Sequence, residues 1–589
     1  MAGHEGMGAI IHEGGVAFRV WAPNADAVSV VGEFNDWDEA ADPMTSEGDG
    51  YWYADVATAV PGHEYRFSIT AGDETFTRID PYAMQVTNSV GNGCIYDHSS
   101  FDWEGDDFTP RSLNDLVIYE MHVGSFAPEG DGVGTLTQVE RNLDHLLKLG
   151  VNCIELMPVM EFAGDYSWGY NPAHIFAVES AYGGPDALKM LVREAHRRGI
   201  SIIIDVVYNH LGPSDLDLWR FDGWGEPDKG GIYFFNDWRS ATPWGDTRPD
   251  YGRGEVRQFL RDNALMWLEH YRVQGLRFDM TPYMRSVNAT ETDIPEGWTL
   301  CRWINDEVRE RFPGAVSIAE DLHGMREVVT LDEDGAGFHS QWDSMFVHPI
   351  REALITPDDA ARSIPAVCDA ITYSYGDAFA RTIYTESHDE VANGRARVPY
   401  EIDEADPTGW YAQKRSTLGA ALTLTSPGVP MLFQGQEFLQ GEWFRDDVPL
   451  DWDLNEEFHG IVRLYRDLIR LRLNTKGTSK GLMGQNSQIL HADDEGKVLA
   501  YHRFMDGGVD DDVVVVVNLS NTTWTDYRIA MPYAGEWTLR LNSDAAIYSD
   551  DFGNAEAFDA QAEEGEDGES PSALVTLAPY SVLVYTRAS

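Results

Sequence analysis

The sequence predicts a multidomain protein in which a (β/α)8 TIM barrel lies between two β-sandwiches. Three observations support this fold class. The 589 residues exceed what one hydrophobic core usually supports. Apolar runs alternate with amphipathic stretches through the middle of the chain, and short strands punctuated by Gly and Asp occupy both ends. We expect an N-terminal immunoglobulin-like β-sandwich over 1–107, the barrel over 108–475, and a C-terminal β-sandwich over 476–589.

The N-terminal region contains short runs typical of strands. They are Val16–Ala22, Ala27–Gly32, Tyr51–Val56 and Tyr65–Thr70. Two tryptophans in this region allow different interpretations, because an indole ring either packs in a sandwich core or stacks, exposed, on a sugar ring. We favour the core for Trp21 and leave both interpretations open for Trp37.

The central region alternates apolar β-type runs with helical stretches, which is typical of βαβ units. The strand candidates are Ile118–His122, Val151–Met157, Ile200–Val207, Gly275–Met280, Val316–Ala319, Thr382–Thr385 and Val429–Gln434. The helix candidates are Leu136–Leu149, Asp186–Arg198, Glu255–Tyr271 and Cys301–Phe312. The length of this alternation favours a closed barrel over an open doubly wound sheet, and no GxGxxG follows a strand to indicate a dinucleotide site.

The C-terminal region returns to strands after a long helix, expected at Phe458–Leu473. The strand candidates are Val498–Phe504, Asp512–Asn518, Trp537–Asn542 and Ala573–Tyr585. The acidic, glycine-containing segment Ala560–Ser570 is expected to be a solvated surface loop.

The charge balance excludes two classes of partner. The chain has 43 Lys and Arg against 98 Asp and Glu, a net charge of −55. Binding to nucleic acid or to an anionic membrane needs clustered positive charge, so neither is expected. Because the acidic residues are spread along the whole chain, we hypothesise adaptation to high intracellular salt, which screens their repulsion. The alternative is a merely acidic protein.

Cysteine and segment patterns add further expectations. The four cysteines, Cys94, Cys153, Cys301 and Cys368, form no CxxC pair and stand near no His cluster, so neither a disulfide framework nor a structural zinc site is expected. The first residues lack a basic, apolar signal pattern, and no run approaches the about 18–20 apolar residues that span a bilayer. We therefore expect a cytoplasmic protein without a cofactor.

Polar residues recur where the predicted barrel strands end, which is where the loops of such a barrel build an active site. These residues are His210, Arg277, Asp279, Glu320, His388 and Asp389. Taken singly, a carboxylate or histidine at a strand end is more often a helix cap or a salt-bridge partner. The repetition of such residues at one strand end after another indicates a single site.

Three carboxylates at such an edge suit retaining glycosidic cleavage, which needs a nucleophile and an acid/base about 5–5.5 Å apart and an oxocarbenium-like transition state. Asp279, Glu320 and Asp389 are the candidates. Arg277 stands two residues before Asp279, on the same face of the strand, where it would hold that carboxylate ionised. The acid must stay protonated near neutral pH, which requires burial or a neighbouring carboxylate.

These stretches resemble the four short motifs of the α-amylase superfamily, glycoside hydrolase family 13. The motifs are Asp205–His210, Gly275–Asp279, Ile318–Asp321 and Ser387–Glu390. The stretches Val20–Ala25 and Val31–Trp37 resemble the N-terminal family 48 carbohydrate-binding modules of glucan-processing enzymes.

The resemblance implies a role for each site residue. Asp279 would be the nucleophile, Glu320 the general acid/base, and Asp389 the carboxylate that grips the sugar hydroxyls. The remaining residues would bind substrate: Tyr170 stacks under the sugar, His210 and His388 bind hydroxyls, and Arg277 orients Asp279. Asp205 is interpreted as a structural member of its motif.

Two groups of the superfamily are represented in different parts of the chain. The stretches Tyr119–Phe126 and Thr281–Met284 look like maltooligosyltrehalose trehalohydrolases, whereas Ser387–Val391 and Pro430–Phe438 look like glycogen branching enzymes. The resemblance therefore implies, first, a 1,4-α-glucan branching enzyme acting on an α-1,4-glucan. The alternatives are a trehalohydrolase or an α-amylase-type hydrolase and, more remotely, a non-catalytic glucan-binding protein.

Two further features have alternative interpretations. Many amylases bind calcium through an Asn at the position of Asn209, but a calcium site takes about 6–8 oxygens and branching enzymes generally lack the ion, so no metal is expected. The aromatic-rich loop Trp219–Trp244 either lines glucan subsites or forms a small core within the barrel loops.

Overall fold

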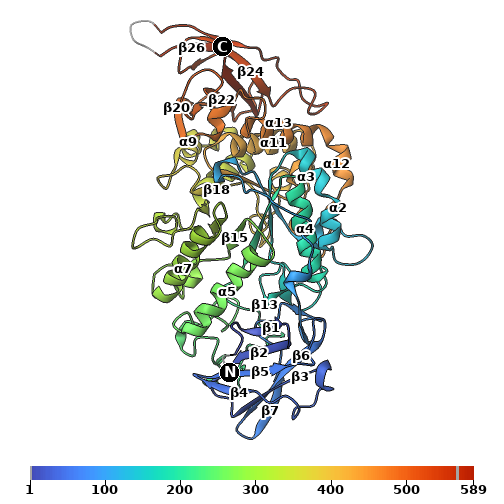
Figure 1. Ribbon diagram of the computed structural model, residues 1–589. Helices are drawn as coiled ribbons and strands as arrows, with labels where there is room; N and C mark the ends of the chain where they lie inside the picture. The colour runs from blue at the N-terminus through green and yellow to red at the C-terminus, as the bar shows by residue number, and fades with distance from the viewer. Residues whose placement is uncertain (1–2, 566–569, 589) are drawn as a thin grey trace.

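The computed structural model describes residues 3–565 and 570–588, which fold into three regions arranged in a line (Figure 1). The N-terminal strands lie at one end of the molecule, the barrel in the middle and the C-terminal strands at the opposite end. The order of strands confirms the predicted fold class: two β-sandwiches flank a closed barrel of eight strands.

The N-terminal sandwich packs two sheets face to face. One sheet has the order β1-β2-β5-β4 and the other β3-β6-β9-β8, with β7 paired to β6. The strands are β1 Gly8–His12, β2 Gly15–Trp21, β3 Ala27–Gly32, β4 Thr45–Gly48, β5 Tyr51–Val56, β6 Glu64–Ala71, β7 Glu74–Arg78, β8 Gln85–Val86 and β9 Gly93–Cys94. All four predicted strands are confirmed. The additional strands are short, and apart from Ala9–Ile11 in β1 they contain no apolar run that the sequence pattern would reveal.

The two tryptophans of this region behave differently. Trp21 is buried and its ring meets the ring of Tyr233 in the barrel edge to face at 5.7 Å, which confirms the core interpretation and extends that core between domains. Trp37 keeps 39% of its surface exposed. Trp37 therefore lies outside the sandwich core.

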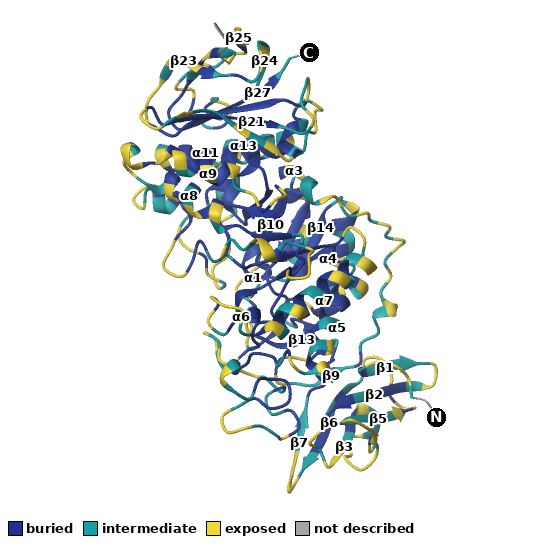
Figure 2. Cartoon of the chain, turned by 90° about the vertical axis from the view of Figure 1, so that its left-hand side faces the viewer, coloured by how far each residue is buried: buried dark blue, intermediate teal, exposed yellow. Residues whose placement is uncertain are grey.

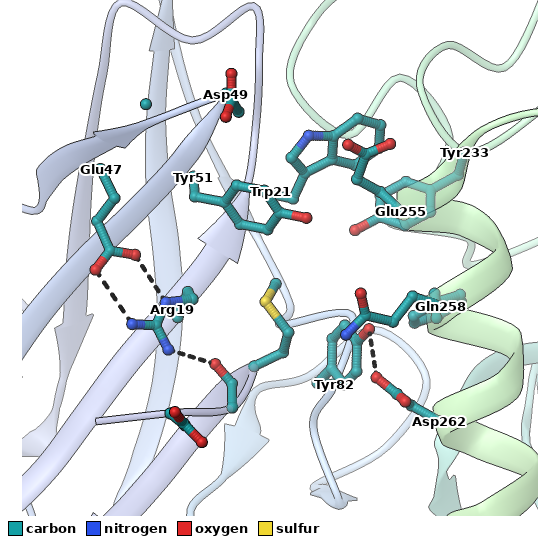
Figure 3. A pocket seen from close by; sticks show the side chains of 15 residues that line it. Arg19, Trp21, Glu47, Asp49, Tyr51, Tyr82, Tyr233, Glu255, Gln258 and Asp262 are labelled. Atoms are coloured by element: carbon teal, nitrogen blue, oxygen red, sulfur yellow. Dashed lines mark hydrogen bonds and ion pairs between the residues drawn. The ribbon is translucent and has the colours of Figure 1, made fainter. Parts of the chain in front are cut away.

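A pocket of about 440 Å³ lies between the N-terminal sandwich and helix α5 (Gly254–His270) of the barrel (Figure 3). Aromatic rings of both domains line it, among them Trp21, Tyr51 and Tyr233, and Tyr82 donates a hydrogen bond to Asp262 of α5 at 3.4 Å. None of the predicted site residues lines this pocket.

The barrel closes in the order β10-β11-β14-β15-β16-β17-β18-β19, with every neighbouring pair parallel. Its strands are β10 Ile118–Met121, β11 Cys153–Leu156, β14 Ser201–Val206, β15 Gly275–Phe278, β16 Val316–Ala319, β17 Ser340–Trp342, β18 Arg381–Ile383 and β19 Val429–Phe433. Every residue of these strands is buried, and Figure 2 shows β10 and β14 in dark blue. This burial explains why most of the strands appear as apolar runs in the sequence.

Seven of these eight strands were predicted, and β17 was missed. Ser340, Gln341 and Trp342 form a strand of three residues with two polar side chains, so no apolar run marks it. The barrel supplies the hydrogen bonds that hold it, since Gln341 pairs with Ala319 on one side and with Arg381 on the other.

The barrel helices depart from the predictions at two places. The stretch Leu136–Leu149 is two helices, α2 Leu136–Arg141 and α3 Leu143–Leu149, which meet at Asn142. Helix α7 begins at Pro295 rather than Cys301, because proline is favoured in the first helical turn. The other predicted helices are confirmed within two residues as α4 Gly184–Arg197, α5 Gly254–His270 and α13 His459–Arg472.

Further elements complete the barrel domain. Its additional helices are α1 Val123–Phe126, α6 Pro282–Arg285, α8 Ser344–Ile355, α9 Ile364–Thr372, α10 Val398–Ile402, α11 Trp410–Thr425 and α12 Asp453–Glu457. A small antiparallel pair, β12 Met160–Phe162 and β13 Pro172–Val178, projects between β11 and α4.

The C-terminal sandwich consists of a sheet in the order β20-β21-β22-β27-β24-β25 and the pair β23-β26. Its strands are β20 Asn486–Asp493, β21 Val498–Phe504, β22 Val513–Asn518, β23 Trp524–Ala530, β24 Gly535–Asn542, β25 Ala560–Ala562, β26 Ser572–Leu577 and β27 Ser581–Arg587. The prediction of one strand over Ala573–Tyr585 was wrong: the chain turns between β26 and β27, where Tyr580 takes a positive φ of 43°.

The prediction of a solvated loop over Ala560–Ser570 is wrong at the start of the segment. It begins with strand β25, which pairs with β24, while residues 566–569 lie outside the described residues. All four cysteines are free thiols, as expected. Among the described residues, no helix has both the length and the apolar character needed to cross a membrane.

Candidate active site

The predicted site residues gather at the carboxyl ends of the barrel strands. His210 follows β14, Asp279 follows β15 and Glu320 follows β16, while His388 and Asp389 follow β18. Because all barrel strands are parallel, these ends meet at one edge. Contacts link all seven predicted residues, Tyr170 and Arg277 included, into one network.

Arg277 is the centre of this network. Its guanidinium is fully buried and forms ion pairs with three carboxylates: Nη1 lies 2.9 Å from Asp205 Oδ2 and 3.4 Å from Asp279 Oδ1, and Nη2 lies 2.8 Å from Glu320 Oε2. Its flat face lies 4.0 Å from the centre of the Trp342 ring. A planar cation that offers several donors can join carboxylates from different strands, which an ammonium group does less well.

Asn209 connects the nucleophile candidate to His210. Its amide nitrogen donates to Asp279 Oδ2 at 2.7 Å and to the Asp279 carbonyl at 2.9 Å. Its amide oxygen lies 2.6 Å from His210 Nδ1, so the imidazole carries a proton on Nδ1 and donates it there. Both ends of the Asn209 amide are therefore engaged within the site. Burial lowers the pKa of His210 to about 4, which keeps the ring neutral.

His388 is the second histidine of the network and, unlike His210, it is charged. Burial alone would lower its pKa, but the carboxylates of Asp389 and Glu120 outweigh that effect and raise the pKa to about 9. Glu120 accepts hydrogen bonds from both Nδ1 and the backbone N–H of His388. The Tyr170 ring stacks on the imidazolium at 4.8 Å, and its hydroxyl donates to Asp205 at 2.6 Å.

Asp279 and Glu320 form a coupled acidic pair. Burial raises the pKa of Asp279 and the Glu320 carboxylate raises it further, while Arg277 and Asn209 act in the opposite direction. Burial likewise raises the pKa of Glu320, against the influence of Arg277. Two buried carboxylates that face the same guanidinium do not both ionise readily, so the pair shares one proton.

The proton of this pair is best placed on Glu320. Asp279 accepts hydrogen bonds on both of its oxygens, from Asn209 and from Arg277, whereas Glu320 accepts only on Oε2, from the Met280 N–H at 3.0 Å. Glu320 Oε1 is buried without a hydrogen-bond partner among the described residues. That oxygen can carry a proton toward a ligand.

Asp389 differs from the other two carboxylates. Its side chain is 40% exposed, and Oδ1 lies 3.7 Å from His388 Nε2 and accepts from Asn393 at 3.3 Å. It therefore stands at the mouth of the site, where it can meet hydroxyl groups of an entering ligand.

Several residues of the network were missed by sequence reasoning. Glu120, on β10, holds His388, and Trp342 supports Arg277 from the unpredicted strand β17. Glu155, paired with Glu120 on β11, is a further buried acid whose pKa is raised by burial and then by Asp205. Glu120 and Glu155 could have been predicted, because each is a charged residue within an otherwise apolar strand run.

Different residues of the aromatic loop Trp219–Trp244 fit the two interpretations, a small core within the loop and a lining of the site. Phe221, Tyr233, Phe234 and Phe235 are buried and form a core within the loop. Trp244 instead stacks on His210 at 4.4 Å with an interplanar angle of 12°, and it remains 36% exposed. One residue of the loop thus covers the site, while most of the loop supports it.

Family models match all three regions of the chain. Residues 6–83 match the carbohydrate-binding module 48 (isoamylase N-terminal domain), residues 121–228 the α-amylase catalytic domain, and residues 489–588 the C-terminal all-β domain of α-amylase. Together with the barrel and its acid-lined edge, these matches define a multidomain enzyme of the α-amylase class.

Relatives place the chain more narrowly. It is 31% identical to the 1,4-alpha-glucan branching enzyme GlgB of Salinibacter ruber over 99% of this chain and 96% of that protein. It is 30% identical to the GlgB of Deinococcus radiodurans over 97% of this chain and 83% of that protein. The chain therefore belongs to the 1,4-alpha-glucan branching enzyme family.

Solved structures share the fold. A putative α-amylase from Salmonella typhimurium superimposes with a TM-score of 0.75 at 23% identity, covering 99% of this chain and all of that one. A type I pullulanase from Bacillus subtilis, solved with maltose, gives a TM-score of 0.78 at 22% identity, covering 100% of this chain and 86% of that one.

Proposed function

We propose that the protein is a 1,4-α-glucan branching enzyme that cleaves an α-1,4 link with retention and joins the released chain to a 6-hydroxyl group of another glucan. Membership of the family, with relatives that match nearly the whole chain, supports this activity. The observation that carries the chemistry is the buried Arg277 guanidinium, which contacts both Asp279 and Glu320 on neighbouring strand ends.

In the first half-reaction, a carboxylate oxygen of Asp279 attacks the anomeric carbon while Glu320 protonates the glycosidic oxygen. The C–O bond breaks, the shortened glucan leaves as an alcohol, and the transferred chain remains as an ester on Asp279. Asn209 and Arg277 hold the Asp279 carboxylate in place. Glu320 Oε1 is the oxygen that donates the proton, because its other oxygen is occupied by Arg277 and the Met280 N–H.

In the second half-reaction, the acceptor 6-hydroxyl attacks the same carbon from the face that the leaving group vacated. Glu320, now ionised, takes the hydroxyl proton, and the Asp279 carboxylate is released. The second inversion restores the α configuration. Asp389, His210 and His388 bind hydroxyl groups of the distorted sugar, and the Tyr170 ring packs against the sugar face.

The product distribution tests this proposal. The purified protein is incubated with amylose in molar KCl, and reducing ends and α-1,6 linkages are followed by proton NMR before and after isoamylase treatment. New α-1,6 signals with few new reducing ends are expected. Reducing ends that rise without branches would instead establish a hydrolase, and maltooligosyltrehalose would be the next substrate to examine.

The Asp279→Asn variant separates the enzyme from a glucan-binding protein. We expect this variant to form neither α-1,6 linkages nor new reducing ends. Glu310→Gln, a matched acid-to-amide change on the exposed face of α7, should retain full activity. Full activity in Asp279→Asn would refute the assignment of the nucleophile.

A further inference from the structure

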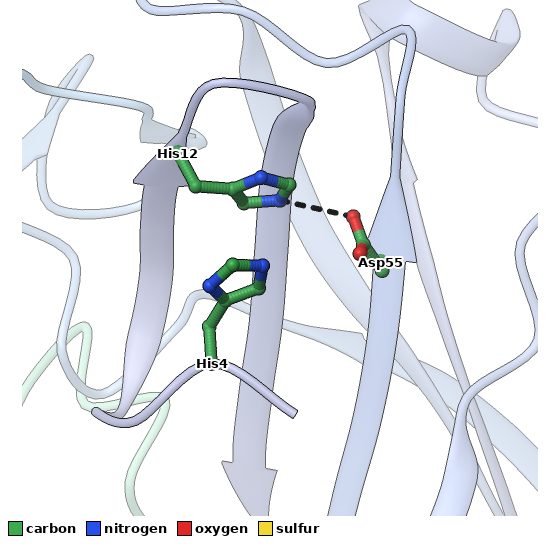
Figure 4. Close-up of side chains that lie close together, drawn as sticks. All are labelled: His4, His12 and Asp55. Carbon is green, nitrogen blue, oxygen red and sulfur yellow. Dashed lines mark hydrogen bonds and ion pairs between the residues drawn. The ribbon is translucent and has the colours of Figure 1, made fainter. Parts of the chain in front are cut away.

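Two histidines and a carboxylate meet on the outer face of the N-terminal sandwich (Figure 4). His4 precedes β1, His12 ends β1, and Asp55 belongs to β5. One potential ligand atom from each side chain lies within 4.8 Å of those from the other two. His12 Nε2 is 3.0 Å from Asp55 Oδ1, and the two imidazole rings stack at 3.9 Å.

The sheet is built so that these side chains can meet. Strand β2 lies between β1 and β5, with Gly15 opposite His12 and Ala17 opposite Asp55. Side chains two residues apart on a strand point to the same face of the sheet. On the face that carries His12 and Asp55, β2 therefore presents only the small residues Gly15 and Ala17. A side chain at position 15 would also meet the Val56 carbonyl at 2.4 Å. His12 therefore reaches across β2 to Asp55.

The position of His4 is set by contacts outside the cluster. Its backbone N–H donates to the Tyr53 hydroxyl at 3.2 Å, and its carbonyl accepts from Arg19 Nη1 at 2.6 Å. Arg19 also binds the Gly6 carbonyl and forms an ion pair with Glu47. The segment before β1 is thus tied to the sheet, with the His4 side chain over His12.

The protonation of His12 suits coordination. The backbone N–H of Gly14 donates to His12 Nδ1 at 3.0 Å, so the lone pair of Nδ1 is engaged and Nε2 carries the proton that faces Asp55. A metal ion replaces such a proton readily, and imidazole with carboxylate is a ligand set of divalent transition ions. We propose that His4, His12 and Asp55 bind a divalent transition-metal ion, with Zn²⁺ as the probe.

The distances agree with this assignment. Ligand atoms about 2.1 Å from a tetrahedral ion lie about 3.4 Å apart, close to the 3.0 Å between His12 Nε2 and Asp55 Oδ1. His4 is exposed, so its ring can turn to direct a nitrogen at the ion. Water fills the remaining positions, and the ion joins the segment before β1 to the sheet.

Calorimetric titration of tag-free protein with ZnCl₂ tests the site. The buffer contains molar KCl and an excess of MgCl₂, because Mg²⁺ occupies the many surface carboxylates but prefers oxygen to imidazole. One Zn²⁺ per chain is expected, with the affinity at least tenfold lower in both His4→Ala and His12→Ala. The control is His459→Ala, an exposed histidine on α13, which should bind as the native protein does.

Cobalt supplies a second measurement on the same proteins. Co²⁺ bound by two imidazoles and a carboxylate should give visible absorption bands that disappear in His12→Ala. No Zn²⁺ binding under these conditions, or binding that is unchanged in His4→Ala and His12→Ala, would overturn the proposal. The branching assay does not enter either measurement, so failure here leaves the proposed function untouched.

Discussion

The barrel edge and the outer surface are both acidic, but different physics governs them. At the edge, Asp205, Asp279 and Glu320 are buried around one guanidinium, and none of the three side chains is more than 7% exposed. On the surface, most of the 98 Asp and Glu residues are in contact with solvent. Buried charges must be balanced by a partner, whereas exposed charges are screened by water and salt. Substitutions in the interior should therefore have large effects, and those on the surface small ones.

The largest expected effect comes from Glu320→Gln. The amide cannot protonate the glycosidic oxygen, so branching should fall on the order of 10³-fold or more. Glucan binding should remain, because the amide keeps the shape of the side chain. Rates on amylose and affinity for malto-oligosaccharide, measured on the same preparation, check this. Loss of binding in parallel with the rate would identify Glu320 as a substrate anchor instead.

Arg277→Met should have the next largest effect, on stability. Removing the cation leaves three buried carboxylates without their partner, which costs about 3–5 kcal/mol. The pKa values of these carboxyls then rise, so the deficit should be larger at pH 8 than at pH 5, where protonation relieves the repulsion. Urea unfolding at both pH values measures it.

The matched surface change is Arg395→Met, which removes a half-exposed partner of Glu390. It should cost less than about 1 kcal/mol. Equal losses in the two variants would contradict the distinction between the buried and exposed charges.

Glu120→Gln should alter the pH dependence of stability. The folded pKa of His388, about 9, lies above its unfolded value of 6.5, so the imidazolium stabilises the protein fully below about pH 6.5 and this contribution is lost as the pH rises through about 9. Without the Glu120 carboxylate, the pKa should fall. The difference in unfolding free energy between the native protein and the variant should therefore shrink from pH 6 to pH 9.5.

Glu437→Gln is the control for Glu120→Gln, because Glu437 is equally buried but pairs with His145 and Tyr119 rather than with His388. A native-to-Glu120→Gln difference that stays constant with pH would show that Glu120 does not hold the charge on His388.

Trp244→Ala should change the ratio of hydrolysis to branching, with a smaller effect than the substitutions above. The indole covers His210 and contacts Tyr283 edge to face, so its removal should admit water to the ester on Asp279. We expect reducing ends to rise severalfold relative to α-1,6 links. Trp303→Ala, an equally exposed indole on the outer helix α7, should leave this ratio unchanged. An unchanged ratio in Trp244→Ala would exclude it as a water barrier.

The smallest expected effect is a gradual increase in thermal stability as salt screens the surface charges. Because screening weakens repulsion among exposed carboxylates, the midpoint of thermal unfolding should rise with KCl up to molar concentrations. Sucrose at equal osmolarity, which is excluded from the surface but screens no charge, should raise it less. A midpoint of thermal unfolding that does not increase with KCl would contradict the hypothesis of adaptation to high salt.

The positions of the predicted elements show where sequence patterns suffice. Strands β14 and β22 were predictable because each contains a run of at least three β-branched apolar residues and is buried within a sheet. Strand β17 was not, because its three residues form a strand only where neighbouring strands supply hydrogen bonds. The turn at Tyr580 was hidden for the opposite reason, since apolar residues lie on both sides of it.

The sequence alone determined the three-part architecture and the seven candidate site residues, because alternation of apolar and polar residues and short motifs are local properties of the chain. Only the tertiary structure decided how these residues are charged and held: Glu120 fixes His388 from another strand, Asn209 joins Asp279 to His210, and Trp342 supports Arg277. It also brought His4 and His12 to Asp55, across a strand that leaves room for them. The physical reason is that burial and charge–charge interaction depend on distances in space, which separation along the chain does not specify.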